Sequence, residues 1–169
     1  MEEVEGFIFS ETPYGETSKI INVFTKEHGL IGMLAKGAKS MKSTLRSSTL
    51  IFTYGIFNIY YKEDKLSIVK SVDIINPLKS IRNDLTLISY LTYITDLTKQ
   101  VIKQNISNEI YNLYMETVLK LDSKLDPLIL TNILEIKYLP YLGVGINLDE
   151  CALCGNKKDI VTIDGSRGG

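Results

Sequence analysis

Residues 20–35 read IINVFTKEHGLIGMLA and decide how the first part of this chain folds. Ile20 to Thr25 is rich in β-branched residues, which is typical of a β-strand. Lys26 to Gly29 is a polar turn, in which Gly29 is free to take the positive φ that a tight turn needs. Leu30 to Ala35 then begins a further strand. The stretch therefore predicts two strands joined by a short turn.

The residues on either side of this pair add three more expected strands. Val4 to Ser10 is β-like, and Leu50 to Tyr61 is a long aromatic and β-branched run that Gly55 interrupts, which favours a sharp bend or a bulge. A charged turn then leads back into Leu66 to Ile75. Five short strands in about 75 residues, with one long basic connection after the third, predict a small barrel of the OB type. A fragment of a β-sandwich is the alternative.

The chain changes character near Asn76 and Pro77, beyond which apolar residues follow helical spacing. Three start signals predict three helices: a cap at Asn83 or Asp84, Glu109 in a first turn, and Asp126 followed by Pro127. The third helix carries Ile129, Ile133, Leu134 and Ile136, and it is closed by Pro140 and Gly143. Short loops between the helices predict a compact bundle behind the barrel. The expected fold class is therefore α+β.

Positive charge is placed locally, because the whole chain has 19 basic and 20 acidic side chains. The stretch from His28 to Lys62 contains no carboxylate, and it holds Lys36, Lys39, Lys42 and Arg46. A cationic face of this kind usually meets an anionic partner, and nucleic acid is the partner we expect. The alternative is a solvated loop that keeps the barrel soluble, although such loops normally contain interspersed acids.

The predicted phosphate-binding residues are the four cations of this stretch, with two further lysines on neighbouring elements as second choices: Lys36, Lys39, Lys42, Arg46, Lys19 and Lys26. Tyr14, in the turn before the second strand, is the predicted base-stacking residue. Alternation along the long fourth strand places aromatic residues on both faces, so we expect most of its rings, from Tyr54 to Tyr61, in the core. His28 is expected at the surface of its turn.

Composition narrows the function classes. With 44% hydrophobic and 23% charged residues, the chain is typical of a globular protein. The acidic N-terminus leads into no long apolar run, so we expect no signal peptide or membrane span and a cytoplasmic protein. Two cysteines do not make a secreted disulfide framework. One histidine and no recognisable pairing of a nucleophile with a base indicate a protein that is not an enzyme.

Cys151 and Cys154, followed by Gly155, have the spacing of half a structural zinc knuckle. Two free thiols are the alternative, and a redox role is weaker because the pair does not begin a helix in a βαβ pattern. His28 is far away in sequence. Oxygen ligands could come from Asp149, Glu150, Asp159 and Asp164, although structural zinc held by two sulfurs seldom uses them. A zinc hydrolase is a remote hypothesis that the missing ligands argue against.

Four strings of residues follow one another along the chain: PYGETSKI at 13–20, FTKEHG at 24–29, AKGAK at 35–39 and, after Leu142 and Gly143, CALCG at 151–155. Together and in this order they resemble the RecO family of bacterial recombination mediators. The resemblance implies an N-terminal OB barrel followed by a helical domain that carries a zinc ribbon of two Cys-x-x-Cys pairs. We accordingly divide the chain into an OB-fold domain at 1–77, a helical domain at 78–148 and a partial zinc-ribbon segment at 149–169.

The resemblance also sets expectations for the cofactor. The family's second Cys-x-x-Cys would follow Gly169, where this sequence ends, so we expect a shortened form with an incomplete ribbon. Cys151 and Cys154 are then a half-site for metal only. Zinc is the cofactor that the resemblance implies, and we do not expect it at full occupancy in this chain.

The implied function is non-catalytic DNA repair by the RecF pathway in the nucleoid. The family binds single- and double-stranded DNA, anneals complementary strands coated with single-strand-binding protein, and helps RecR and RecF to load RecA. Lys36 and Lys39 match the family's basic motif, whereas Lys42 and Arg46 are inferred from charge and proximity in sequence. The alternative from another class is a scaffold whose barrel binds an acidic peptide tail, such as that of single-strand-binding protein, with DNA contact secondary.

Overall fold

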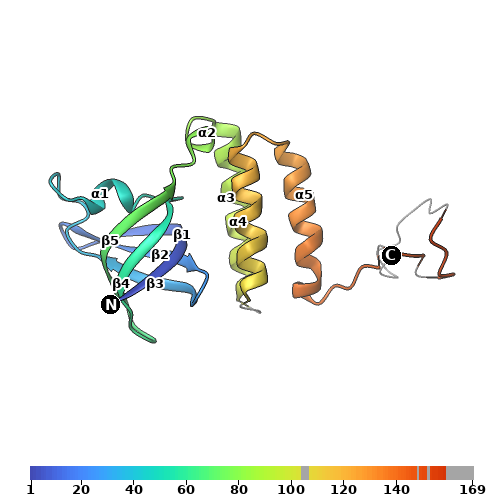
Figure 1. Cartoon of the computed structure of the whole chain (residues 1–169), viewed down its shortest axis with the longest axis horizontal. Helices are drawn as coiled ribbons and strands as arrows, with labels where there is room; N and C mark the ends of the chain where they lie inside the picture. Colours follow the sequence, from blue (N-terminus) through green and yellow to red (C-terminus); the bar gives the residue numbers. More distant parts are fainter. Residues whose placement is uncertain (104–106, 148, 152, 159–169) are drawn as a thin grey trace.

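Five strands form a closed barrel in the computed structural model, which describes residues 1–103, 107–147, 149–151 and 153–158 (Figure 1). They are β1 (Glu2–Tyr14), β2 (Ser18–Thr25), β3 (Gly29–Ala35), β4 (Tyr54–Tyr60) and β5 (Ser67–Asn76). Their order around the barrel is β1-β2-β3-β5-β4. The contact of β3 with β5 is parallel, and the other four contacts are antiparallel. Closure confirms the OB-type barrel and excludes the sandwich fragment.

Glycine controls the geometry where the strands turn or bend. Gly29 has φ of +65°, as expected for the turn between β2 and β3. At Gly55 the pairing of β4 with β5 shifts register, which confirms the expected bulge. A Cβ atom at Gly55 would lie 2.6 Å from the carbonyl oxygen of Asp73, so a larger residue would push the two strands apart.

Two strands differ in extent from the prediction. β4 begins at Tyr54 instead of Leu50, because Phe52 has φ of +63° and turns the chain before the strand starts. β1 continues past Ser10 to Tyr14, since its second half pairs with the start of β2. The expectation that the rings of the fourth strand lie in the core is wrong for its end. Tyr54 and Phe57 are buried there, whereas Tyr60 and Tyr61 are exposed.

The helices are α1 (Leu45–Ser48), α2 (Lys79–Arg82), α3 (Leu85–Ile102), α4 (Asn108–Asp122) and α5 (Pro127–Tyr138), followed by the 3-10 helix η1 (Leu139–Leu142). The expected starts of the three long helices are confirmed. The carboxylate of Asp84 accepts hydrogen bonds from two backbone N–H groups of α3, and that of Asp126 does the same for α5. Glu109 lies in the first turn of α4. The sequence did not predict α1 and α2.

The apolar side chains form two cores. One fills the barrel interior with residues from all five strands, among them Ile8, Met33 and Phe57. The other lies between the outside of the barrel and the helices, where Phe9 and Phe24 pack on Tyr114 with ring centroids 5.0 and 6.1 Å apart. The second core packs the helices against one side of the barrel.

α3 and α4 lie nearest the barrel, and α5 is the long helix farthest from it (Figure 1). The compact bundle is formed only in part. Leu134 of α5 is buried, but Ile129, Ile133 and Ile136 are each about half exposed. None of the helices within the described ranges is long and apolar enough to cross a membrane. β5 ends at Asn76 and α2 begins at Lys79, so the barrel and the helices meet at this short joint.

Candidate nucleic-acid interface

The connection between β3 and β4, residues 36–53, contains the carboxylate-free group of cations and is called the basic loop below. Lys36, Lys39, Lys42 and Arg46 are all exposed on it. Two apolar side chains of the loop point the other way: Ala38 and Leu45 are buried in the barrel core. The loop is therefore pinned to the barrel at two points, and its charged side chains remain in solvent.

Backbone hydrogen bonds tie the basic loop to the turn between β1 and β2. The N–H of Lys39 donates to the carbonyl oxygen of Thr17 at 2.7 Å, and the N–H of Gly37 donates to Ser18 Oγ at 3.1 Å. The ammonium group of Lys39 lies 3.5 Å from the carbonyl oxygen of Gly15. Tyr14 ends β1 beside this turn and is 53% exposed. The structure thus brings the predicted stacking residue close to the predicted phosphate ligands, at one end of the barrel.

The second-choice lysines are placed differently. Lys19 is buried, and its ammonium group lies 2.6 Å from a carboxylate oxygen of Glu11, so its charge is already paired. Lys26 is exposed in the turn between β2 and β3, at the other end of β2. That strand has eight residues, and at about 3.3 Å per residue it separates Lys26 from the basic loop by roughly 25 Å. Phosphate binding by Lys19 and Lys26 stays a prediction, and neither side chain is part of the surface that the basic loop forms.

The end of the barrel that holds Lys26 has a mixed charge. We call it the mixed end, and it consists of the β2–β3 and β4–β5 turns, residues 26–28 and 61–66. His28 Nε2 lies 2.7 Å from a carboxylate oxygen of Glu2, and its ring stacks on Tyr61 with centroids 4.0 Å apart. His28 is therefore half-buried between two partners and is not a free surface residue. Both turns contain lysines and carboxylates next to one another in sequence.

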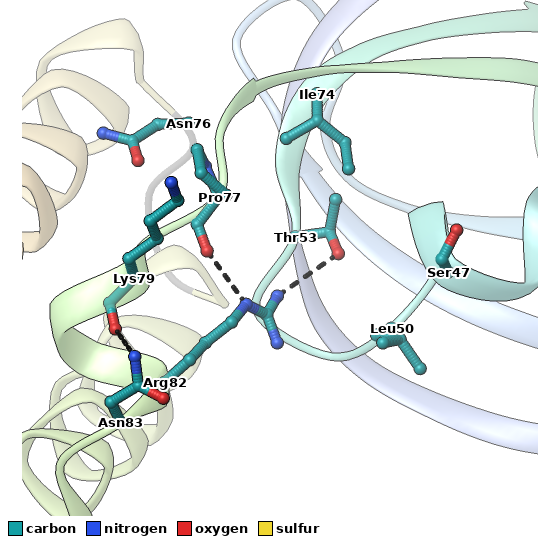
Figure 2. A pocket seen from close by; sticks show the side chains of 9 residues that line it. All are labelled: Ser47, Leu50, Thr53, Ile74, Asn76, Pro77, Lys79, Arg82 and Asn83. Atoms are coloured by element: carbon teal, nitrogen blue, oxygen red, sulfur yellow. Dashed lines mark hydrogen bonds between the residues drawn. The ribbon is translucent and has the colours of Figure 1, made fainter.

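A pocket of about 290 Å³ lies where the basic loop meets α2, and we call it the joint pocket (Figure 2). Its lining residues are Ser47, Leu50, Thr53, Ile74, Asn76, Pro77, Lys79, Arg82 and Asn83. The guanidinium group of Arg82 reaches across the joint and donates to the carbonyl oxygens of Pro77 at 3.0 Å and Phe52 at 3.1 Å. Arg82 therefore fixes the end of the basic loop to the helical part of the chain.

The interpretation of the sequence missed Lys79 and Arg82. Both lie beyond the carboxylate-free stretch, in a four-residue helix that periodicity cannot detect. The available signal was a pair of cations three positions apart, beginning two residues after Pro77, which marks the joint between the strands and the helices.

The cysteine pair forms a tight turn. The N–H of Gly155, which has φ of +68°, donates to the carbonyl oxygen of Cys151 at 2.9 Å. The backbone N–H groups of Cys154 and then Leu153 donate to the sulfur of Cys151 and lower the pKa of its thiol, which favours the thiolate that binds zinc. This donor set fits half of a zinc knuckle.

A complete metal site would need ligands beyond the two cysteines. The part of the chain that the structure describes contains no group of three or more metal-ligating side chains, and Asp159 and Asp164 lie outside that part. A tetrahedral site needs four ligands, so the residues described supply only half of one. The metal half-site and its low occupancy stay predictions.

The chain is similar to known protein families and to individual named proteins. Two family models match: Recombination protein O N terminal over residues 1–78, and Recombination protein O C terminal over residues 82–169. Proteins named DNA repair protein RecO are similar over most of the chain. The one from Halalkalibacterium halodurans is 36% identical over 153 residues, which are 90% of this chain and 60% of that protein.

Two further proteins named DNA repair protein RecO are also similar to this chain. The protein from Listeria monocytogenes serotype 4a is 36% identical over 156 residues, 92% of this chain and 61% of its own length. The protein from Bacillus cytotoxicus is 33% identical over 169 residues, 99% of this chain and 68% of its own length. The chain thus spans about 60% of the length of the first two relatives. The barrel lies within the residues matched by the first family model, and α3, α4 and α5 lie within those matched by the second.

Proposed function

Because this chain belongs to the RecO family of DNA repair proteins, we propose that it binds single- and double-stranded DNA through its basic loop and mediates recombination. In this role it anneals complementary strands and assists the loading of RecA on DNA coated with single-strand-binding protein, with RecR and RecF as further partners. No bond is made or broken in the process. The protein acts by holding strands and bringing them together.

The observation that carries the proposal is the exposure of four cations on one loop without a carboxylate among them. Lys36, Lys39, Lys42 and Arg46 all face solvent, while Ala38 and Leu45 hold the loop on the barrel. A surface that neutralises phosphates lowers the repulsion between two strands that must pair. Each phosphate contact on a single strand also releases condensed counterions, which gives a salt slope of about 0.7 per contact. Four contacts would make affinity fall steeply with salt.

Tyr14 complements this charge. Its exposed ring lies at the turn to which Lys39 is hydrogen-bonded, so a base next to a bound phosphate could stack on it. Stacking of a base on an aromatic side chain contributes about 1–3 kcal/mol and depends little on sequence. Binding by charge and stacking suits a mediator, which must act on any broken DNA.

The test is fluorescence anisotropy of a labelled single-stranded oligonucleotide, titrated at several salt concentrations. The variant K36E/K39E/K42E should bind at least 30-fold more weakly than wild type at low salt, with a flatter salt slope and an unchanged thermal unfolding midpoint. The matched control K62E/K65E/K103E makes the same change of net charge on exposed lysines elsewhere and should stay within about threefold. Equal losses in both variants, or unfolding of the loop variant, would refute a specific loop site.

A second candidate function uses the same cations. An acidic peptide tail would present carboxylates to Lys36, Lys39 and Lys42 much as DNA presents phosphates. Competition separates the two uses: a tail peptide that displaces DNA at matched ionic strength shares the loop. A peptide that binds without displacing DNA occupies another surface.

A further inference from the structure

We propose that the joint pocket binds one nucleotide of a single strand and extends the DNA path from the basic loop onto α2. This inference rests on the proposed DNA binding by the loop. The proposed strand is single, because only an unpaired base leaves its face and its edges free for protein side chains. The class of ligand is therefore unpaired DNA with its phosphate toward the cations of α2.

Continuity with the basic loop is the first argument. Ser47 follows Arg46 directly, and Leu50 lies at the end of the same loop, so the pocket begins where the cations of the loop end. Across the pocket lie Lys79 and Arg82 of α2, as Figure 2 shows. A strand that leaves Arg46 toward the helices meets this pocket without crossing a carboxylate of the pocket lining.

The chemistry of the lining is the second argument. Leu50, Ile74 and Pro77 present apolar surface, and the first two are 42% and 48% exposed. Apolar surface of this kind is suited to the face of a base, whereas the backbone phosphate needs a cation at the rim. The volume of about 290 Å³ is at the lower end of the range for small-molecule pockets, which suits a single nucleotide.

Lys79 is the cation that is available to the phosphate. Its side chain is exposed, and its ammonium group has no hydrogen-bond or ion-pair partner among the residues that the structure places. Arg82, in contrast, is held by the carbonyl oxygens of Pro77, Ile51 and Phe52 and shapes the pocket. Lys79 is thus the binding residue, and Arg82 positions the loop.

The carboxylates near α2 have other partners. Asp84 accepts the N–H groups at the start of α3, at 2.8 and 3.2 Å. Asp122 accepts the N–H groups of Ser80 and Ile81 at 3.0 and 3.1 Å. Neither carboxylate lines the joint pocket, whose lining contains two charged side chains, Lys79 and Arg82, both of them cations.

The first experiment compares K79E with K124E. Lys124 lines a neighbouring pocket on the other side of Lys79 and controls for a general change of field. With a single strand long enough to reach from the loop to α2, K79E should bind about tenfold more weakly, and its salt slope should fall by about 0.7. K124E should stay within twofold. Wild-type affinity and slope in K79E would overturn the inference.

The second experiment tests the base. An abasic site is moved along the oligonucleotide, and wild type should bind about fivefold more weakly when it occupies the position of the pocket. L50A removes exposed apolar surface without opening a core, and it should lose this discrimination. An abasic scan that is flat in wild type would refute a base in the pocket.

The outcomes also separate this inference from the proposed function. Loss of binding in K36E/K39E/K42E with wild-type behaviour of K79E leaves the loop site standing and refutes the pocket. Wild-type binding in both variants refutes the two together. If K79E weakens an acidic peptide and leaves DNA unaffected, the pocket is a peptide site and the nucleotide assignment is wrong.

Discussion

The two ends of the barrel carry similar numbers of basic side chains but differ in their carboxylates. The basic loop has Lys36, Lys39, Lys42 and Arg46, and residues 36–53 contain no acid. The mixed end has three lysines and three carboxylates: Lys26, Lys62 and Lys65 with Glu27, Glu63 and Asp64. The number of lysines therefore does not distinguish the two ends. What distinguishes them is that the basic loop itself contains no carboxylate, although Glu16 lies in the adjoining turn between β1 and β2.

This difference has a physical basis in screening. At physiological ionic strength the Debye length is about 8 Å, so an exposed lysine attracts a phosphate mainly at short range. A carboxylate one or two residues away then acts on the same phosphate with opposite sign. We therefore expect a loop without acids of its own to attract a phosphate more strongly than the mixed end, where the carboxylates largely cancel the attraction of the lysines.

The largest effect on DNA affinity is expected when acidic residues are added to the basic loop and its lysines are kept. Ser40 and Thr44 are exposed between the cations, so S40E/T44E makes the loop resemble the mixed end. Each new carboxylate at about 4 Å from a bound phosphate costs about 1 kcal/mol in water, and two cost about 2 kcal/mol, or roughly 30-fold in affinity. Anisotropy titration measures this, with S40Q/T44Q as the control for shape. Wild-type affinity in S40E/T44E would contradict the explanation.

The converse change should give a smaller effect. Replacing the acids of the mixed end, as E27Q/E63Q/D64N, leaves three uncompensated lysines there. Asp64 has φ of +54°, which asparagine tolerates, so the turn keeps its shape. We expect about a fivefold gain in DNA affinity when this change is made in the K36E/K39E/K42E background, measured by the same titration. If DNA affinity does not rise, charge alone does not decide where DNA binds, and the geometry of the basic loop is needed as well.

The mixed end should instead matter for stability. H28A removes the contact with Glu2 at 2.7 Å and the stacking on Tyr61. A partly exposed hydrogen bond to a charged group and a ring contact together should cost about 1–2 kcal/mol of unfolding free energy. Chemical denaturation measures this loss, and DNA affinity should not change. A fall in affinity with full stability would place His28 at a binding surface.

Much of the barrel could be predicted from the sequence because its signals are local. Turn residues such as Gly29 and the break at Gly55 mark where a strand must turn or bulge, whatever it packs against. Helix caps at Asp84 and Asp126 are local in the same way. α1 and α2 are each only four residues long, so they have no period to detect. Apolar spacing in α5 could not say that Ile129 and Ile133 stay exposed, because spacing shows which residues share a face and not what covers it.

The candidate site, like the fold, could be predicted where its residues lie close together in sequence. The four cations of the basic loop stand close together in sequence, and the structure keeps them on one exposed loop. The pairing of Lys19 with Glu11 depends on the register between β1 and β2, which no local pattern gives. Arg82 acts on the carbonyl oxygens of residues 51 and 52 across the joint, a contact that only the assembled fold creates.

Substitution of Lys26 is expected to change DNA affinity least, so it is the most sensitive test of the contrast between the two ends of the barrel. Lys26 directly follows β2, whose other end meets the basic loop about 25 Å away, and this distance is roughly three Debye lengths. Glu27 follows it directly and offsets its charge. K26E should therefore change DNA affinity by less than twofold, and the K36E variant, with the same change of net charge, by about fivefold. Equal effects of the two single variants would mean that DNA spans both ends of the barrel, and the contrast between them would no longer explain where it binds.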